Sequence, residues 1–429
     1  MAGPTVDADG ERTSARGAAG GAGPGRAAVV VLGGLVALGP LTTDLYLPAL
    51  PALTADLHST APAVQLTLTA SLLGMALGQL LFGPASDRHG RRRPLLAGMG
   101  LYTLATAVCV LAPSVPVLVA GRFLQGMAGA AGLVIARAVA RDRYEGVAMI
   151  RFMASLALVS GLAPIVAPVL GAQLLHVTTW RGSFVVLAVT GGLLSLAAAL
   201  GVQESLPPER RHAGGLSTTL RAVGGLLRDR RFVGFTVTTT FSFGALFGYV
   251  SGSSTVLQEV YHASPQAYSL LFAVNSVALM ASTQLNGRVL VTRVRPDALM
   301  VTGLCGAVLA GAVLTLATGV WDLGLAAVCP AMCLLMTSMG MVGPNSSARA
   351  LSRAPHAAGS ASALLGVSTF VCGAVVAPLS SVAGHPSGLA LGLVVLVCAL
   401  LSLTAFLALC RPWRPAVAAA ARAGAGAGT

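Results

Sequence analysis

Lysine is absent from this 429-residue sequence, and all 27 of its Lys and Arg positions are arginines. A Walker A loop needs a lysine before its Ser or Thr to bind the phosphates of ATP, and pyridoxal phosphate is held through a lysine Schiff base. The composition therefore excludes a pump that uses ATP through a Walker A loop of this chain, and it excludes a pyridoxal-dependent enzyme.

Charged and aromatic residues are scarce. Only 10% of the residues are charged and 5% are aromatic, whereas 55% are hydrophobic. Soluble domains carry about 25% charged residues, so most of this chain is expected to lie in a lipid bilayer. The net charge of +13 does not indicate a nucleic-acid partner, because the arginines lie in short loops between apolar runs.

Patterns that bind metals are missing from the sequence as well. The seven cysteines lie in or at the ends of apolar runs, and the seven histidines lie in predicted loops or at the ends of runs. Neither set has the spacing of a zinc site, and no Asp-rich or His-rich cluster indicates a membrane-embedded enzyme. We expect a protein that is not an enzyme and that needs no metal and no cofactor.

About twelve apolar runs are each long enough to cross the hydrocarbon core as a helix. They cover residues 27–50, 63–86, 95–112, 117–139, 150–175, 183–202, 232–256, 267–290, 298–319, 323–347, 357–382 and 388–410. We expect an all-α integral membrane protein with two six-helix bundles, at 27–202 and 232–410, joined by a linker at 203–231. Residues 1–26 form a predicted disordered tail and residues 411–429 a second tail. No convincing cleavage site follows the first run, so it is predicted to be a retained span and not a signal peptide.

Two short motifs occur once in each half of the chain. Gly-Met-Ala-Gly at 126–129 returns as Gly-Met-Val-Gly at 340–343, and Val-Ala-Pro at 166–168 returns at 376–378. Two six-span halves arranged as a parallel repeat would place the two copies of each motif at matching positions of the two halves.

The arginines lie almost entirely on one side of the membrane if the N-terminus is cytoplasmic. The outer loops then carry one arginine, Arg181, and Arg122 lies within a run, so that the other 25 fall on the cytoplasmic side. By the positive-inside rule, both termini and the linker are predicted to be cytoplasmic, with the protein in the cytoplasmic (inner) membrane.

One hydrophilic loop, residues 83–93, holds six ionisable residues in eleven positions between the second and third runs. Arginines that only anchored the flanking helices would need neither the aspartate nor the glycines of this loop. We therefore interpret the loop as functional, through Gly83, Asp87, Arg88, Gly90, Arg91 and Arg92. Asp87 is predicted to latch the two bundles by pairing with a helix N-terminus or with a charge cluster after the fourth run, formed by Arg137, Arg141, Asp142 and Arg143.

Asp44 is the one acidic residue placed inside a run. A carboxylate at membrane depth costs about 2.5–3.5 kcal/mol on insertion scales, so Asp44 should face a cavity or a partner and is a candidate proton carrier. Alternatively, it only caps the first span near the outer surface. Arg122 begins the fourth run with Gln125 one turn away, and it is the candidate partner of Asp44 unless it extends to the membrane interface.

Glycines and prolines punctuate the fifth run at Gly161, Pro164, Pro168 and Gly171. A kinked gating helix and a closely packed helix would use the same residues, and the spacing does not separate the two. The candidate contacts for a substrate are a few aromatic and amide side chains of the runs, and ordinary packing is the alternative for any single one of them: Tyr46, Gln125, Phe241, Phe243, Tyr249, Asn275 and Asn345.

Several longer motifs follow one another along the chain. They are Thr-Asp-Leu-Tyr-Leu-Pro-Ala-Leu-Pro at 43–51, Gly-x-x-x-Asp-Arg-x-Gly-Arg-Arg at 83–92, Arg-Phe-Leu-Gln-Gly at 122–126, Arg-Ala-Val-Ala-Arg-Asp at 137–142, Gly-Leu-Ala-Pro-Ile-Val-Ala-Pro at 161–168 and Gly-Ser-Ala-Ser-Ala-Leu-Leu-Gly at 359–366. Together they resemble the Bcr/CflA drug-resistance branch of the major facilitator superfamily over nearly the whole chain.

The resemblance implies proton-driven antiport of small, largely apolar drugs, by alternating access between the two bundles. The expected partners are the drug, protons and the bilayer, and a monomer is expected. Two positions depart from the family. Val36 stands where some multidrug relatives carry a second acid, which favours one proton per cycle, and the loop near Gly287-Arg288 lacks an equivalent of Asp87, which makes the latch asymmetric. The alternative is a proton symporter for a small nutrient, which would need a more polar cavity.

Overall fold

The computed structural model describes residues 26–144, 146–211, 223–319, 321, 323–354, 358–381 and 387–411, and these residues form helices and no strand. Twelve helical segments in this described part are long and apolar enough to cross a membrane. The predicted all-α membrane fold is confirmed. The predicted tails, except for Arg26 and Arg411, and residues 212–222 of the predicted linker lie outside the described residues.

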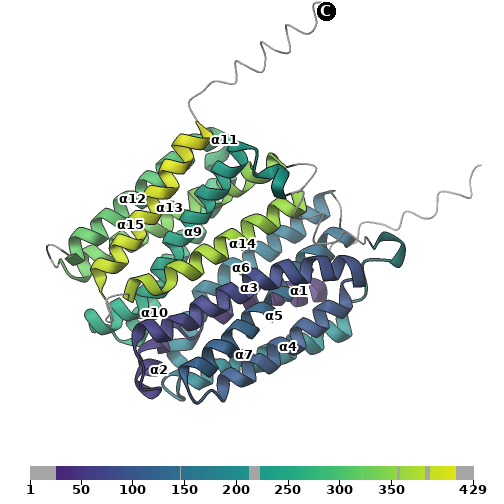
Figure 1. Ribbon diagram of the computed structural model, residues 1–429, viewed down its shortest axis with the longest axis horizontal. Coiled ribbons are helices and arrows are strands. Elements are labelled where there is room, and N and C mark those ends of the chain that lie inside the picture. The colour runs from purple at the N-terminus through teal and green to yellow at the C-terminus, as the bar shows by residue number, and fades with distance from the viewer. Residues whose placement is uncertain are drawn as a thin grey trace, which may run out of the picture.

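The helices form two bundles that follow one another along the chain (Figure 1). The first bundle contains α1 (Arg26–Asp44), α2 (Leu50–Asp56), α3 (Ala61–His89), α4 (Arg92–Val110), α5 (Val115–Arg143), α6 (Gly146–Leu174) and α7 (Trp180–Gly201). The second contains α9 (Arg230–Thr255), α10 (Pro265–Leu285), α11 (Val291–Arg293), α12 (Pro296–Gly319), α13 (Leu325–Ser352), α14 (Ala358–Val376) and α15 (Gly388–Ala405).

Local sequence explains where several helices begin and how closely they pack. Proline stands in the first turn of α3, α5 and α10, where its missing N–H has no helical partner to lose. Glycine lets the backbones of α3 and α5 touch, because a Cβ on Gly126 would lie 2.1 Å from the carbonyl oxygen of Ser71. The α3–α5 pair therefore forms a tight centre of the first bundle.

The two bundles meet along two helix pairs. α3 packs against α14, and α6 packs against α10 (Figure 1). The repeated motifs lie at matching places, since the two Gly-Met-x-Gly segments belong to α5 and α13, the fourth spans of their bundles. The Val-Ala-Pro segments belong to the two fifth spans: the first lies in α6, and the second crosses from α14 into the 3-10 helix η6 (Ala377–Ser381).

The first span differs from the expectation of one run over residues 27–50. α1 ends at Asp44, the chain turns, and it continues as the 3-10 helix η1 (Leu47–Ala49) and then α2. Pro48 and Pro51 cause the break, because proline lacks the N–H of a continuing helix and its ring clashes with the preceding turn. We call residues 45–48 the reversal; the helix is interrupted there, while the span itself continues to Asp56.

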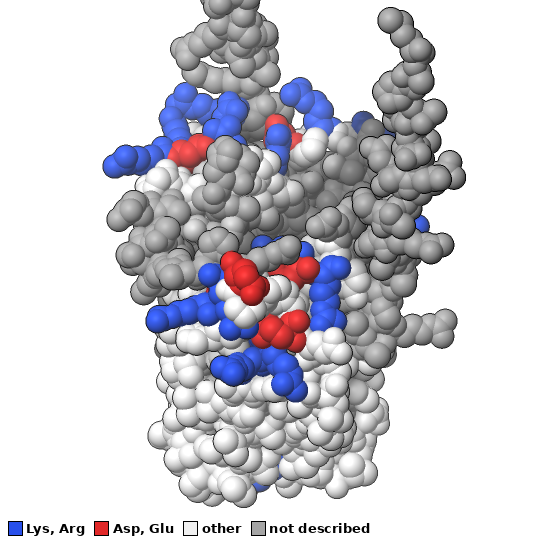
Figure 2. Space-filling view, turned by 90° about the vertical axis from the view of Figure 1, so that its right-hand side faces the viewer, with Lys and Arg blue, Asp and Glu red and all other residues white. Residues whose placement is uncertain are grey.

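Consecutive spans run in opposite directions, which sorts the helix ends into two sets. One set, the arginine-rich end, includes Arg88, Arg91–Arg93, Arg143, Arg349 and Arg353; Figure 2 looks onto a face where basic and acidic side chains gather. The other set, the Pro48 end, includes Pro48, Asp56 and Arg181.

Candidate functional site

Asp44 lies inside the protein, at the point where α1 ends. Only 6% of its surface is exposed, and it is the only acidic residue among the buried residues of the described chain. A buried carboxylate in a membrane-spanning segment is costly and usually serves ion or substrate pathways. The reversal begins directly after it, so Asp44 stands at a broken helix and not in the middle of a rigid one.

Arg122 of α5 is fully buried inside the first bundle. Its Nη1 donates to the carbonyl oxygen of Thr42 at 3.0 Å and to Oε1 of Gln125 at 2.6 Å. The guanidinium lies 4.5 Å from the centre of the Tyr46 ring, a cation–π contact. Nε and Nη2 have no hydrogen-bond partner among the described residues, so this buried cation keeps unused donors.

The predicted ion pair between Asp44 and Arg122 is not present. The ion pairs of the described residues do not include Asp44. Arg122 instead donates to the Thr42 carbonyl oxygen and to Gln125 Oε1. Asp44 is within electrostatic reach of Arg122, and also of Tyr249 and Tyr268 in the second bundle.

Tyr46 and Gln125, two of the predicted substrate contacts, support Arg122 within the first bundle. The Tyr46 hydroxyl shares a hydrogen bond with Thr67 Oγ1 at 3.0 Å, and Gln125 Nε2 donates to Thr106 Oγ1 at 2.9 Å. Both side chains are fully buried. Thr42, Thr67 and Thr106 were not predicted, because single threonines in apolar runs carry no distinctive pattern.

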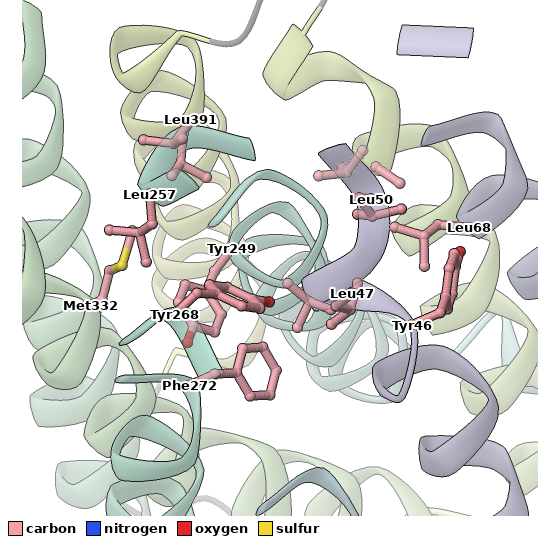
Figure 3. Packing of buried hydrophobic residues seen from close by; sticks show 14 of the residues in the cluster. Tyr46, Leu47, Leu50, Leu68, Tyr249, Leu257, Tyr268, Phe272, Met332 and Leu391 are labelled. Carbon is pink, nitrogen blue, oxygen red and sulfur yellow. The ribbon is translucent and has the colours of Figure 1, made fainter. Parts of the chain in front are cut away.

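The structure brings Tyr249 and Asn275 together in the second bundle. Asn275 Nδ2 donates to the Tyr249 hydroxyl at 2.9 Å, and the Tyr249 ring stacks on Phe272 with centroids 5.6 Å apart. In Figure 3, Leu47 of the reversal points toward Tyr249, while Tyr46 points the other way, toward Leu68. The second bundle thus presents an aromatic group to the segment that follows Asp44.

Asn345 lies in a different place. Its Nδ2 donates to Asn286 Oδ1 at 3.1 Å and to the Met341 carbonyl oxygen at 2.8 Å. Asn286, which was not predicted, begins the π-helical segment η4 (Asn286–Leu290) at the end of α10. Of the other two aromatic candidates, Phe243 packs on Phe247, and Phe241 is half-buried beside the apolar core.

Arg91, and not Asp87, is the centre of the loop between α3 and α4. Its guanidinium pairs with Asp87 Oδ1 at 2.5 Å and with Asp142 Oδ2 at 2.8 Å, and Nη1 also donates to Ser86 Oγ at 2.8 Å. The Arg91 side chain is only 7% exposed, against 17% for Asp142 and 54% for Asp87. The loop is therefore tied to the end of α5.

Glu204, which follows α7, holds the other side of this loop. Its Oε1 accepts the main-chain N–H of Arg91 at 2.8 Å, and its Oε2 accepts that of Arg92 at 3.2 Å. Partial burial raises the pKa of Glu204, but main-chain N–H donors from the loop and from Ser205 and Leu206 outweigh it and hold the pKa below its usual range. Gly90 has φ +86, and a Cβ there would lie 2.4 Å from Glu204 Oε2, so the position requires glycine.

Among the described residues, no contact of Asp87 or of its loop latches the two bundles together. Every ionic partner of the loop among the described residues belongs to the first bundle or to the chain just after α7. Arg137 and Arg141 are exposed and form no ion pair in the described chain. Arg88 and Arg92 are exposed as well, and Arg92 donates to the Ala199 carbonyl oxygen. The Gly83 carbonyl oxygen accepts a hydrogen bond from Ser86 Oγ.

The second bundle carries its own ion pair at the equivalent place, with the charges exchanged. In the first bundle, Arg91 stands at the start of the third span and Asp142 near the end of the fourth. In the second, Asp297 stands at the start of the third span and pairs with Arg349 near the end of the fourth. The two bundles thus differ in that the acidic and the basic position of this ion pair are exchanged. Each bundle is held by an ion pair of its own at this end.

The helix α6 combines loose and tight positions. A Cβ on Gly161 would meet only Met280 Sδ at 3.8 Å, an ordinary contact, whereas a Cβ on Gly171 would lie 1.9 Å from the Leu45 carbonyl oxygen. The Pro164 carbonyl oxygen accepts from Ser276 of α10 at 3.4 Å, and Pro168 lies inside the helix. α6 is therefore closely packed at Gly171, next to the reversal.

Hydrogen bonds between the bundles gather near the Pro48 end. Gln65 Nε2 reaches the Ser251 carbonyl oxygen at 3.4 Å, Thr69 donates to the Ala374 carbonyl oxygen at 2.9 Å, and Gln266 donates to the Ala172 carbonyl oxygen at 3.3 Å. The charged groups of the arginine-rich end pair only within their own bundles in the part of the chain that is described. The bundles are thus joined more firmly at the Pro48 end.

Comparisons with known proteins agree with this architecture. The model of the family described as Major Facilitator Superfamily matches residues 32–378. An MFS-type transporter of Bacillus subtilis, YdgK, is 39% identical over 88% of this chain and 94% of its own. A bicyclomycin resistance protein homolog of Haemophilus influenzae is 31% identical over 82% and 88%, and multidrug resistance protein D of Escherichia coli is 29% identical over 87% and 93%.

Solved structures share the fold at low sequence identity. The crystal structure of a mutant of the nucleoside transporter NupG aligns with a TM-score of 0.71 and 12% identity over 90% of this chain and all of that one. Such a likeness concerns the arrangement of the twelve spans and not the substrate.

Proposed function

The chain belongs to the major facilitator superfamily, in its Bcr/CflA-type drug-transporter branch, and from this premise we propose that it exports small hydrophobic antibiotics or related compounds in exchange for protons. The names of the resistance relatives support the class of substrate. The single observation that supports proton exchange is Asp44, the only buried acid of the described chain.

Asp44 has the surroundings that an exchange site requires. An antiporter needs one site whose proton and drug occupancies oppose each other. Asp44 lies next to the reversal and within electrostatic reach of Arg122 in one bundle and of Tyr249 in the other. A relative movement of the bundles would therefore change the surroundings of its carboxylate, as alternating access requires.

Orientation belongs to the same proposal. The arginine-rich end faces the cytoplasm, together with both termini and the linker, because basic residues near span ends are retained on that side. The Pro48 end then faces outward, and the structure corresponds to a transporter closed on the outside. The functional unit is a monomer that needs no cofactor, and the coupling residues are Asp44 and Arg122.

Transport by purified protein in proteoliposomes tests this function. Vesicles that are acidic inside should accumulate a labelled drug, such as chloramphenicol, as protons leave in exchange. A proton symporter, the second candidate, would instead accumulate its substrate when the outside is acidic. No accumulation of any member of a drug panel in either gradient would contradict the proposal.

A further inference from the structure

The reversal that follows Asp44 is bound by the second bundle through its main chain. Ser254 Oγ of α9 donates to the Leu47 carbonyl oxygen at 2.5 Å, and Gln258 Nε2 donates to the Pro48 carbonyl oxygen at 3.2 Å. Gln258 Nε2 also donates to Ser254 Oγ at 2.8 Å, which links the two donors. Ser254, Leu47 and Pro48 are buried, and Gln258 is half-buried.

These bonds differ from the other contacts between the bundles in what they hold. Other cross-bundle bonds reach the main chain of regular helices, as in Thr69 to Ala374 and Gln266 to Ala172, or join two side chains, as in Gln65 to Ser380. Ser254 and Gln258 instead hold a segment that is not part of a long helix and that lies three and four residues after Asp44.

The first bundle holds the same segment from its other side. The Leu45 carbonyl oxygen lies against Gly171 of α6, and the Tyr46 ring lies under the Arg122 guanidinium. Figure 3 shows Tyr46 and Leu47 pointing in opposite directions from the reversal. A displacement of Asp44 would therefore move the carbonyl groups on which Ser254 and Gln258 close.

We propose that Ser254 and Gln258 form the latch that holds the Pro48 end closed, and that the reversal transmits the occupancy of Asp44 to this latch. Opening toward the Pro48 end must break both hydrogen bonds, because α9 and the reversal belong to different bundles. The role of Asp44 in this statement rests on the proposed drug–proton exchange, whereas the latch itself does not.

Gln258 belongs to the π-helical segment η3 (Val256–Val260), which follows α9 directly. A π-helical turn shifts the following side chains around the axis and is frequent at functional sites. Here it accompanies an arrangement in which residues 254 and 258 of one helix end reach two successive carbonyl groups of the reversal.

Hydrogen exchange measured by mass spectrometry on the purified full-length protein tests the latch without any drug. We compare wild type with Ser254→Ala, Gln258→Leu and the double variant. Losing one hydrogen bond should change the ratio of the two conformations by about threefold to tenfold. We expect faster exchange at residues 52–60 and 255–264, and slower exchange at residues 83–93 as the arginine-rich end closes in return.

Ser251→Ala is the matched control. Ser251 lies one turn before Ser254 on the same helix, and its hydroxyl is bonded within that helix, to the Gly248 carbonyl oxygen. This variant should exchange like wild type. An unchanged double variant, faster exchange at both ends, or an equal effect of Ser251→Ala would overturn the latch.

Drug accumulation by the same variants separates the two proposals. If the latch variants shift the exchange pattern but no drug is transported by wild type, the proposed function fails and the latch stands. If wild type transports a drug and the exchange pattern of the double variant is unchanged, the latch fails and the proposed function stands.

Discussion

The carbonyl oxygen of Leu45 lies against the α-carbon of Gly171, so closely that a Cβ on Gly171 would be 1.9 Å from it. This contact joins the fifth span to the chain immediately after Asp44. Any side chain at position 171 must push the reversal away from α6, because the obstacle is backbone and not the end of a flexible side chain.

Gly171→Ala should therefore impair transport while leaving the protein inserted in the membrane. The displaced reversal would carry Asp44 and the Ser254 contact with it, and we expect drug accumulation to fall by about tenfold, the effect of roughly 1.4 kcal/mol. Gly161→Ala is the control, since its Cβ would meet only Met280 Sδ at 3.8 Å. Equal activities of the two variants in proteoliposomes would disprove a positioning role for Gly171.

Arg122 is a buried cation whose hydrogen-bond partners are uncharged, and its replacement should affect both stability and transport. Arg122→Ala removes the donor to Thr42 and Gln125, and each buried acceptor left unpaired costs about 1–3 kcal/mol. We expect a lower melting temperature and loss of proton-coupled transport. Arg122→Lys should restore only part of the transport, because an ammonium cannot reproduce the planar guanidinium over the Tyr46 ring. Transport by Arg122→Ala equal to wild type at every pH would contradict this role.

The loop around Arg91 predicts an order of effects within one cluster. Asp142→Asn should destabilise the protein more than Asp87→Asn, because the Asp142 side chain is 17% exposed and that of Asp87 is 54% exposed. Losing the exposed ion pair of Asp87 should cost about 0–1 kcal/mol of stability. Losing the Asp142 carboxylate should cost about 1–3 kcal/mol, because it leaves part of the buried Arg91 guanidinium without its partner. Melting temperatures of the two variants, measured in the same detergent, check the order. A larger shift for Asp87→Asn would restore Asp87 as the centre of the loop.

Glu204 predicts a pH dependence of stability. Its folded pKa lies below the usual range, so its contribution is present above the unfolded value, about 4.3, and is lost as the pH falls through the folded pKa. Glu204→Gln should thus lower the melting temperature at pH 7, and the difference from wild type should shrink as the pH falls below about 4.3. A gap between wild type and variant that stays constant from pH 7 to pH 3 would contradict the assignment. Glu209→Gln, at an acid in the same stretch, is the control.

The sequence predicts the spans and the buried acid well, because both follow from the cost of polar groups in lipid. A run of more than twenty apolar residues has few alternatives to a transmembrane helix, and the cost of embedding Asp44 makes it stand out among the acids. The break after Asp44 could have been inferred from Pro48 and Pro51, although hydropathy alone runs across it.

Contacts between distant segments could not be predicted in this way. Arg91 rather than Asp87 is the centre of its loop because two partners from elsewhere in the chain bond Arg91. Asp142 comes from the end of α5, and Glu204 lies more than a hundred residues away in the sequence. The Asn286–Asn345 pair likewise needs α10 and α13 to be neighbours. The hydrogen bonds of Arg122 to the Thr42 carbonyl oxygen and to Gln125, in place of an ion pair with Asp44, likewise depend on how α1 and α5 pack.

Asp44→Asn tests the mechanism that all these contacts would serve. The amide imitates a permanently protonated carboxyl group, so uphill drug accumulation should be lost while downhill drug exchange survives. If drug binding favours the deprotonated carboxylate, drug added to weakly buffered wild-type protein should release protons, and the variant should release none. Asp56→Asn, at an acid of the Pro48 end that pairs with Arg181, should still release them. Because binding of the proton and of the drug must affect each other equally, the drug affinity of wild type should also fall as the pH is lowered, and that of Asp44→Asn should not change. Proton release of equal size from Asp44→Asn would assign the coupling to another residue.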